Sequence, residues 1–156
     1  MPHLAFILIR PTVVSEAAHT LKGEAELKFK AQDFTSALKF AKLAKDLDPN
    51  LEGVEQFIAA YRVYVAAAAP SAYFDLPTRM FNGEPNWYDI LGLTDIWIET
   101  EVIRKQYKKM EELVHPDKNN SIAAEGAFKL ISEAWRFLSN PYRRLAYNVG
   151  LDPDFQ

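Results

Sequence analysis

Apolar residues recur at helical spacing along most of this chain, and this pattern constrains its fold more than any other feature. Residues 15–48 follow the pattern with one interruption at 32–34, which predicts two helices in an antiparallel hairpin. Pro49 ends the second helix, because proline lacks the N–H that a continuing helix needs. A third helix is expected over residues 51–69, with its apolar side chains on one side.

The second half of the chain continues the helical pattern in shorter segments. Residues 86–92 predict a short helix with Asn86 as its N-cap. Two longer helices are expected over residues 100–114 and 121–138, and a short one over 142–148. The chain is therefore predicted to be all-α.

The predicted helix at 100–114 has two opposed sides. On a helical wheel, a narrow apolar stripe is formed by Ile103, Tyr107, Met110 and Val114. The opposite side carries the cations Arg104, Lys105, Lys108 and Lys109. Most charged helix faces are only solvated surfaces. This one ends at a sharp turn, which favours a docking surface.

The turn after this helix is His115-Pro116-Asp117. Pro116 pushes His115 into extended geometry and so ends the helix. The Asp117 carboxylate can accept backbone hydrogen bonds or meet an arginine of a partner. This arrangement indicates a rigid, charged turn presented to a partner protein and argues against a catalytic pocket.

Composition excludes several classes of site. The 156 residues carry a net charge of −3, which argues against a general binder of nucleic acid or anionic membranes. The absence of cysteine excludes disulfides, thiolate zinc sites and a cysteine nucleophile. The three histidines lack metal-ligand spacing, and no activated nucleophile or phosphate-binding glycine loop accompanies them. We therefore expect no enzyme activity and no cofactor or metal.

The apolar run at residues 4–9 is too short to span a bilayer and lacks a basic leader. No membrane association is expected, and the missing signals favour the cytoplasm or the nucleus.

Residues 86–149 resemble a J domain, the DnaJ-type co-chaperone module. The residues that carry the resemblance are Trp87-Tyr88-Asp89-Ile90-Leu91-Gly92, Ile103-Arg104-Lys105-Gln106-Tyr107-Lys108-Lys109, His115-Pro116-Asp117-Lys118-Asn119, Ala127-Phe128, Ala134-Trp135, Leu138 and Arg143-Arg144-Leu145-Ala146-Tyr147. The resemblance implies four helices, of which the second and third form an antiparallel pair.

The resemblance also implies a partner, a seventy-kilodalton heat-shock chaperone of the DnaK class whose ATPase is stimulated. The residues implied to contact it are Arg104, Tyr107, Lys108 and Lys109, with His115, Pro116 and Asp117 setting the coupling. Arg143 and Arg144 match a secondary basic contact. None of these residues would do chemistry on a substrate.

The N-terminal hairpin resembles a single tetratricopeptide repeat. Its small, aromatic and proline positions are occupied by Ala25, Phe34, Ala37, Ala44 and Pro49, whereas Leu21 stands at the usual tryptophan position. Together with the J domain, this segment resembles the N-terminal part of certain plant J-domain proteins. One repeat cannot bury its own apolar face. The hairpin therefore serves either as a structural helical cap or as a groove for a client or adaptor protein.

These observations predict a division of the chain. We expect a poorly ordered tail at 1–15, a tetratricopeptide-like helical segment at 16–69, a linker at 70–85, the J domain at 86–149 and a C-terminal tail at 150–156.

Two other functions stay open beside the co-chaperone. The alternative interpretation is a helical adaptor that binds partners through the N-terminal groove and keeps a weakened J domain as a scaffold. A nucleic-acid binder is the least favoured, because the basic patch is small and lacks interleaved surface aromatics.

Three features depart from the family pattern or lack an explanation. Glu111 and Glu112 replace the usual alanine and apolar residue at the end of the basic helix, where the helix dipole disfavours anions. The apolar run Ile96-Trp97-Ile98 suggests packing against the linker or the N-terminal helices. Gly126 within a helix costs about 1 kcal/mol relative to alanine, for no functional reason visible in the sequence.

We expect the substitution E112L to strengthen stimulation of the chaperone ATPase. Glu112 lies within the basic side, where it reduces the positive field, although each intrahelical pairing is worth only about 0.2–0.5 kcal/mol. Steady-state ATPase measurements with and without the substitution test this expectation, and an unchanged or weaker stimulation would count against it.

Overall fold

The computed structural model describes residues 11–68, 79–80, 84–151 and 154 of the chain. The helices of this part are α2 (Pro11–Lys30), α3 (Phe34–Leu47), α4 (Val54–Ala68), α5 (Trp87–Ile90), α6 (Thr100–Val114), α7 (Ala124–Leu138) and α8 (Pro141–Leu151). Two short strands, β1 (Arg79–Met80) and β2 (Glu84–Pro85), pair antiparallel between α4 and α5. The predicted all-α class is confirmed, and this strand pair is its single exception among the described residues.

Two boundaries differ from the prediction. Helix α2 begins at Pro11, so residues 11–15 of the expected tail are helical, while residues 1–10 lie outside the described part. Proline suits a first helical position, where its missing N–H has no intrahelical partner. At the other end, α8 continues to Leu151, which is buried. Most of the linker expected at 70–85 lies outside the described residues.

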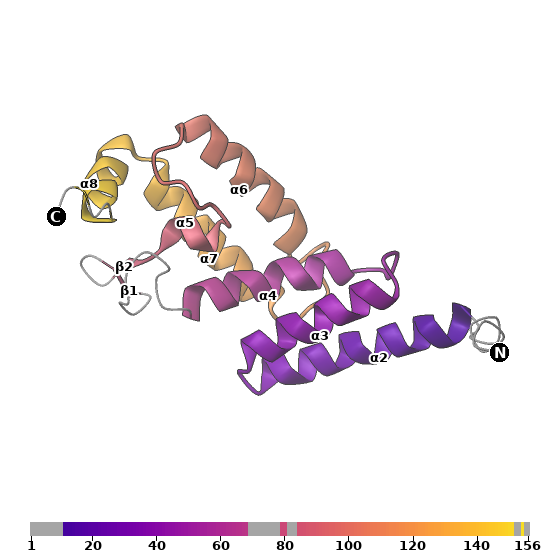
Figure 1. The fold of residues 1–156 in the computed structure, drawn as a ribbon. Helices are drawn as coiled ribbons and strands as arrows, with labels where there is room; N and C mark the ends of the chain where they lie inside the picture. The colour runs from indigo at the N-terminus through magenta and orange to yellow at the C-terminus, as the bar shows by residue number, and fades with distance from the viewer. Residues whose placement is uncertain (1–10, 69–78, 81–83, 152–153, 155–156) are drawn as a thin grey trace.

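Helices α2 and α3 form the predicted antiparallel hairpin (Figure 1). The side chains between them are small and fully buried: Ala18, Ala25, Ala37, Ala41 and Ala44. Alanines allow the two backbones to approach closely. Asp33 caps α3, its carboxylate accepting a hydrogen bond of 3.1 Å from the Ser36 N–H.

Helix α4 lies at the centre of the molecule, between the hairpin and the C-terminal helices (Figure 1). It packs against α3 and also against α5, α6 and α7. A helix that is apolar on several sides has to be covered on several sides, and α4 buries Val54, Phe57, Ile58, Ala59, Ala60, Tyr61 and Val63. The third helix is therefore a shared core element of both halves.

Tyr64 of α4 lies directly over Gly126 of α7. A Cβ atom at Gly126 of α7 would lie 1.7 Å from the Tyr64 hydroxyl oxygen and 2.8 Å from its ring carbon Cζ. The Tyr64 ring also packs against Phe29 and Phe34, with ring centroids 4.7 and 5.1 Å apart. Gly126, which the sequence left unexplained, makes room for a tyrosine that connects the hairpin to α7.

We predict that G126A destabilises the protein and that G23A stabilises it. Both glycines are helical, and alanine is favoured over glycine in a helix by about 1 kcal/mol. Gly23 has open space around it, so this gain is realised there. At Gly126 overpacking against Tyr64 costs about 1–3 kcal/mol, which outweighs the gain. Urea unfolding measures both effects, and a G126A protein more stable than wild type would contradict the prediction.

Candidate functional site

The turn at His115-Pro116-Asp117 directly follows α6. His115 is the C-cap of α6 and has left helical geometry, with φ −58° and ψ 128°, as the following proline predicts. Its Nδ1 accepts a hydrogen bond of 3.1 Å from the Asp117 N–H. Its ring packs edge-on against Phe128 of α7, with centroids 5.1 Å apart. The imidazole is thus oriented from two sides, whereas the Asp117 side chain is 88% exposed and is available to a partner.

Asn119 anchors the loop that follows the turn. Its side chain is 3% exposed and has partners for both of its polar atoms. Nδ2 donates to the carbonyl oxygens of Leu113 in α6 and Gln56 in α4, at 3.0 and 2.8 Å. Oδ1 accepts from the Ser121 N–H at 2.9 Å. The sequence indicated only a polar loop here, because the Gln56 carbonyl is distant in sequence.

The cations of α6 face solvent on one side of the helix. Arg104, Lys105, Lys108 and Lys109 are all exposed. Arg104 makes a double hydrogen bond with Glu101, which lowers the pKa of that carboxyl. Lys108 pairs with Glu111 at 3.6 Å. Among the described residues, Lys105 and Lys109 are in no ion pair, so their charges are the most available on this side.

Tyr107 lies between α6 and α7, with the Lys108 ammonium 5.7 Å from the centre of its ring. Its ring is 8% exposed and stacks on Trp135 at a centroid distance of 5.5 Å and an interplanar angle of 9°. Its hydroxyl donates to Glu111 at 2.6 Å. The residue therefore belongs to the predicted apolar stripe, and it offers a partner little beyond the hydroxyl edge.

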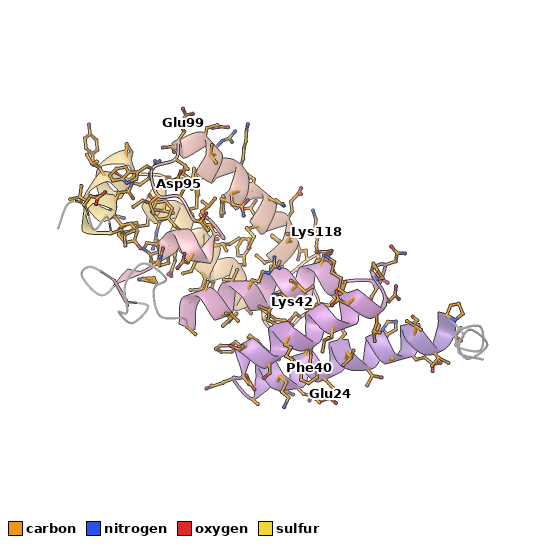
Figure 2. The ribbon with its side chains drawn as sticks, in the orientation of Figure 1. Glu24, Phe40, Lys42, Asp95, Glu99 and Lys118 are labelled. Atoms are coloured by element: carbon orange, nitrogen blue, oxygen red, sulfur yellow. The ribbon has the colours of Figure 1, made fainter. Side chains whose placement is uncertain are left out.

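The ring contacts between α6 and α7 also give the relative direction of these two helices. Tyr107 faces Trp135, and His115 faces Phe128. Positions later in α6 thus meet positions earlier in α7, so the helices are antiparallel (Figure 1). Lys118 follows the turn at the end of α6 and lies next to α4, whereas Glu99 stands just before the start of α6 (Figure 2).

Arg143 and Arg144, which the sequence matches to a secondary basic contact, have different surroundings on α8. The Arg144 guanidinium is half-buried and donates to the Thr100 hydroxyl at 2.8 Å and to the Ile98 carbonyl oxygen. Arg143 is exposed and lies 5.7 Å from the centre of the Phe137 ring. Neighbouring residues on a helix point about 100° apart, which explains the separation.

The backbone of the apolar run at 96–98 is hydrogen-bonded to α8. Packing against the linker or the N-terminal helices stays a prediction, because most of the linker lies outside the described residues. Asn148 of α8 donates to the Ile96 carbonyl oxygen at 2.9 Å, and Arg144 donates to that of Ile98. Ile96 is buried, whereas Trp97 is 48% exposed. This loop, which also carries Asp95 (Figure 2), leads into α6 in the chain and is hydrogen-bonded to α8.

A groove of about 250 Å³ lies between α4 and α6, beside the basic side of α6. Its polar lining includes Glu55, Arg62, Asp89 and Lys109. Burial raises the pKa of the Asp89 carboxyl.

Within the described ranges, no three His, Asp or Glu side chains are grouped as metal ligands. None of the described helices has the length and apolarity that a membrane span needs. The arrangement presents charges and hydrogen-bonding groups to a partner.

Comparison with known proteins finds similarity in the C-terminal part. The family model "DnaJ domain" matches residues 86–148. An uncharacterised J-domain-containing protein of Schizosaccharomyces pombe is 44% identical over 69 residues, which cover 44% of this chain and 17% of the relative. "DnaJ homolog subfamily C member 14" of Mus musculus is 41% identical over 66 residues, or 42% of this chain and 9% of the relative. "Chaperone protein DnaJ" of Enterococcus faecalis is 38% identical over 74 residues, or 45% and 19%.

The chain thus spans less than a fifth of the length of these curated relatives. No solved structure matches the chain.

We predict that R144A destabilises the protein much more than R143A. Hydrogen bonds to a charged donor contribute about 1.5–3 kcal/mol, and Arg144 makes two that join α8 to the start of α6. Substitutions at exposed positions such as Arg143 usually stay within about 0.5 kcal/mol. Urea unfolding measures the difference, and equal effects of the two substitutions would contradict it.

Proposed function

Residues 86–148 form a DnaJ domain, and from this we propose that the protein is a co-chaperone that docks on a seventy-kilodalton heat-shock chaperone and stimulates its ATPase. The observation that carries the proposal is the His115-Pro116-Asp117 turn at the end of α6. Its imidazole is held by Phe128 and by the Asp117 N–H, while the Asp117 carboxylate is exposed.

The exposed cations of α6 would guide docking. Arg104, Lys105, Lys108 and Lys109 give one side of the helix a positive surface that ends at the turn. Such charge complementarity speeds association and weakens as salt screens it. In this proposal Arg104, Lys108 and Lys109 contact an acidic surface of the chaperone, and Asp117 meets one of its basic groups.

The remaining proposed site residues have supporting roles. Pro116 ends α6 and sets the turn, and Tyr107 keeps α6 in register with α7 through Trp135. Arg143 is available for a secondary contact, whereas Arg144 holds α8 against the start of α6. We keep the proposed division into a helical segment at 16–69 and a J domain at 86–149, with α4 packed against both.

We predict that H115Q reduces stimulation of the chaperone ATPase to the basal rate of the chaperone. Glutamine cannot reproduce both the ring contact with Phe128 and the acceptor that Nδ1 offers Asp117. H19Q is the matched control, because His19 is exposed on α2, far along the chain from the turn. The measurement is steady-state ATPase activity across a range of concentrations of the full chain.

Two results would contradict the proposal. One is wild-type protein that leaves the chaperone ATPase at its basal rate. The other is an H115Q protein that stimulates as well as H19Q. A different result would favour the helical-adaptor hypothesis. In that case neither the wild-type protein nor H115Q affects the ATPase, and H115Q still binds a partner through the N-terminal helices.

A further inference from the structure

Glu26 of α2 is bonded directly to the loop that follows the His115-Pro116-Asp117 turn. Its Oε2 accepts a hydrogen bond of 2.9 Å from the Ser121 hydroxyl, 95 residues away in sequence. Its Oε1 accepts one of 3.0 Å from the Ile122 N–H. The two carboxylate oxygens thus hold two consecutive residues of the loop.

The same carboxylate is also held by α4. The Tyr61 hydroxyl donates to Glu26 Oε2 at 2.7 Å. Tyr61 is fully buried, and burial together with this hydrogen bond raises the pKa of its hydroxyl. The hydroxyl therefore remains a donor over the working pH range. Hydrogen bonds to an ionised acceptor are about twice as strong as neutral ones, so the carboxylate firmly joins α2, α4 and the loop.

Ser121 passes this contact on to the start of α7. Its hydroxyl donates to Glu26 and accepts a hydrogen bond of 3.1 Å from the Ala123 N–H. The sequence predicts that this helix begins at residue 121. The structure places the Ser121 hydroxyl one turn before α7, which begins at Ala124 without a side-chain cap of its own. Glu26 orients the hydroxyl that closes this turn.

A second anchor on the same loop comes from α4, where the Gln56 carbonyl oxygen accepts a hydrogen bond from Asn119 at 2.8 Å. The N-terminal helices thus hold the loop at residues 119, 121 and 122. The carbonyl oxygen of His115 accepts bonds from the N–H groups of Lys118 and Asn119, both at 2.9 Å. The anchored residues are therefore bonded back to the turn itself.

We infer that Glu26 is a positioning residue for the His115-Pro116-Asp117 turn, and that the N-terminal helices pre-organise the docking loop. The functional part of this inference rests on the proposed co-chaperone role. Loss of the carboxylate frees the far end of the loop, so the turn spends less time in its docking geometry. Apparent affinity then falls in proportion to the competent fraction, while the stimulated rate at saturation is retained.

The test compares E26Q with E24Q in the full chain. Glutamine keeps the size of Glu26 but replaces one acceptor oxygen with an NH₂ group, which cannot accept. Glu24 is on the same helix and loses the same charge, but it lies on the side of α2 away from α4 (Figure 2). Amide hydrogen exchange read residue by residue reports on the loop, and the ATPase titration reports separately on half-maximal concentration and maximal rate.

We expect E26Q to speed exchange of the Ile122 and Asn119 amides by about tenfold or more relative to buried amides of α7. The half-maximal concentration for ATPase stimulation should rise several-fold at an unchanged maximal rate, and E24Q should match wild type in both assays. S121A keeps Glu26 and removes one of the loop bonds. It should change exchange at Ile122 in the same direction, and it decides the matter if E26Q does not fold.

Wild-type exchange rates in the loop of E26Q would overturn the inference. Equal acceleration in the loop and throughout α7 would do so as well, because the carboxylate would then serve only global stability. If wild-type protein fails to stimulate the ATPase but E26Q still loosens the loop selectively, the proposed function fails and the positioning of the turn stands.

Discussion

Burial of α4 on both sides joins the N-terminal hairpin to the helices of the C-terminal half. Toward the hairpin it packs on α3, and toward the C-terminal helices it packs on α5, α6 and α7. Its residues supply the Gln56 carbonyl to the docking loop, the Tyr61 hydroxyl to Glu26 and the Tyr64 ring to the space above Gly126. A tetratricopeptide-like hairpin has one uncovered apolar face, and α4 covers part of it while completing the core of the DnaJ domain.

The basic side of α6 shows how local pairing shapes a charged surface. Arg104 and Lys108 are paired within the helix to Glu101 and Glu111, and such exposed pairs have little effect on stability. They do affect where on this side the positive field is strongest, because a paired cation presents a weaker field than one without a nearby carboxylate. Glu111 also accepts the Tyr107 hydroxyl. The anion that seemed misplaced at the helix end therefore has two partners.

Much of the fold follows from local pattern, but the loop anchors do not. Helical periodicity predicts the helices, and Pro116 predicts the end of α6, because both depend on residues a turn or two apart. Helical periodicity also places Tyr107 in the apolar stripe. The contacts of Glu26 and Gln56 with the loop join residues more than 60 positions apart, and no spacing rule reports them. Adjacency in sequence also does not report that Arg143 and Arg144 have different neighbours, because their side chains leave α8 in different directions.

The space at Gly126 links the composition of two distant positions. A side chain at 126 requires either a shift of the Tyr64 ring or a smaller residue at 64, and a smaller residue there removes one ring contact each from Phe29 and Phe34, which keep the contact with each other. The two positions are therefore coupled through packing. A larger residue at 126 would have to displace the Tyr64 ring for α7 to keep its place on α4. The N-terminal helices and this DnaJ domain are matched parts rather than interchangeable modules.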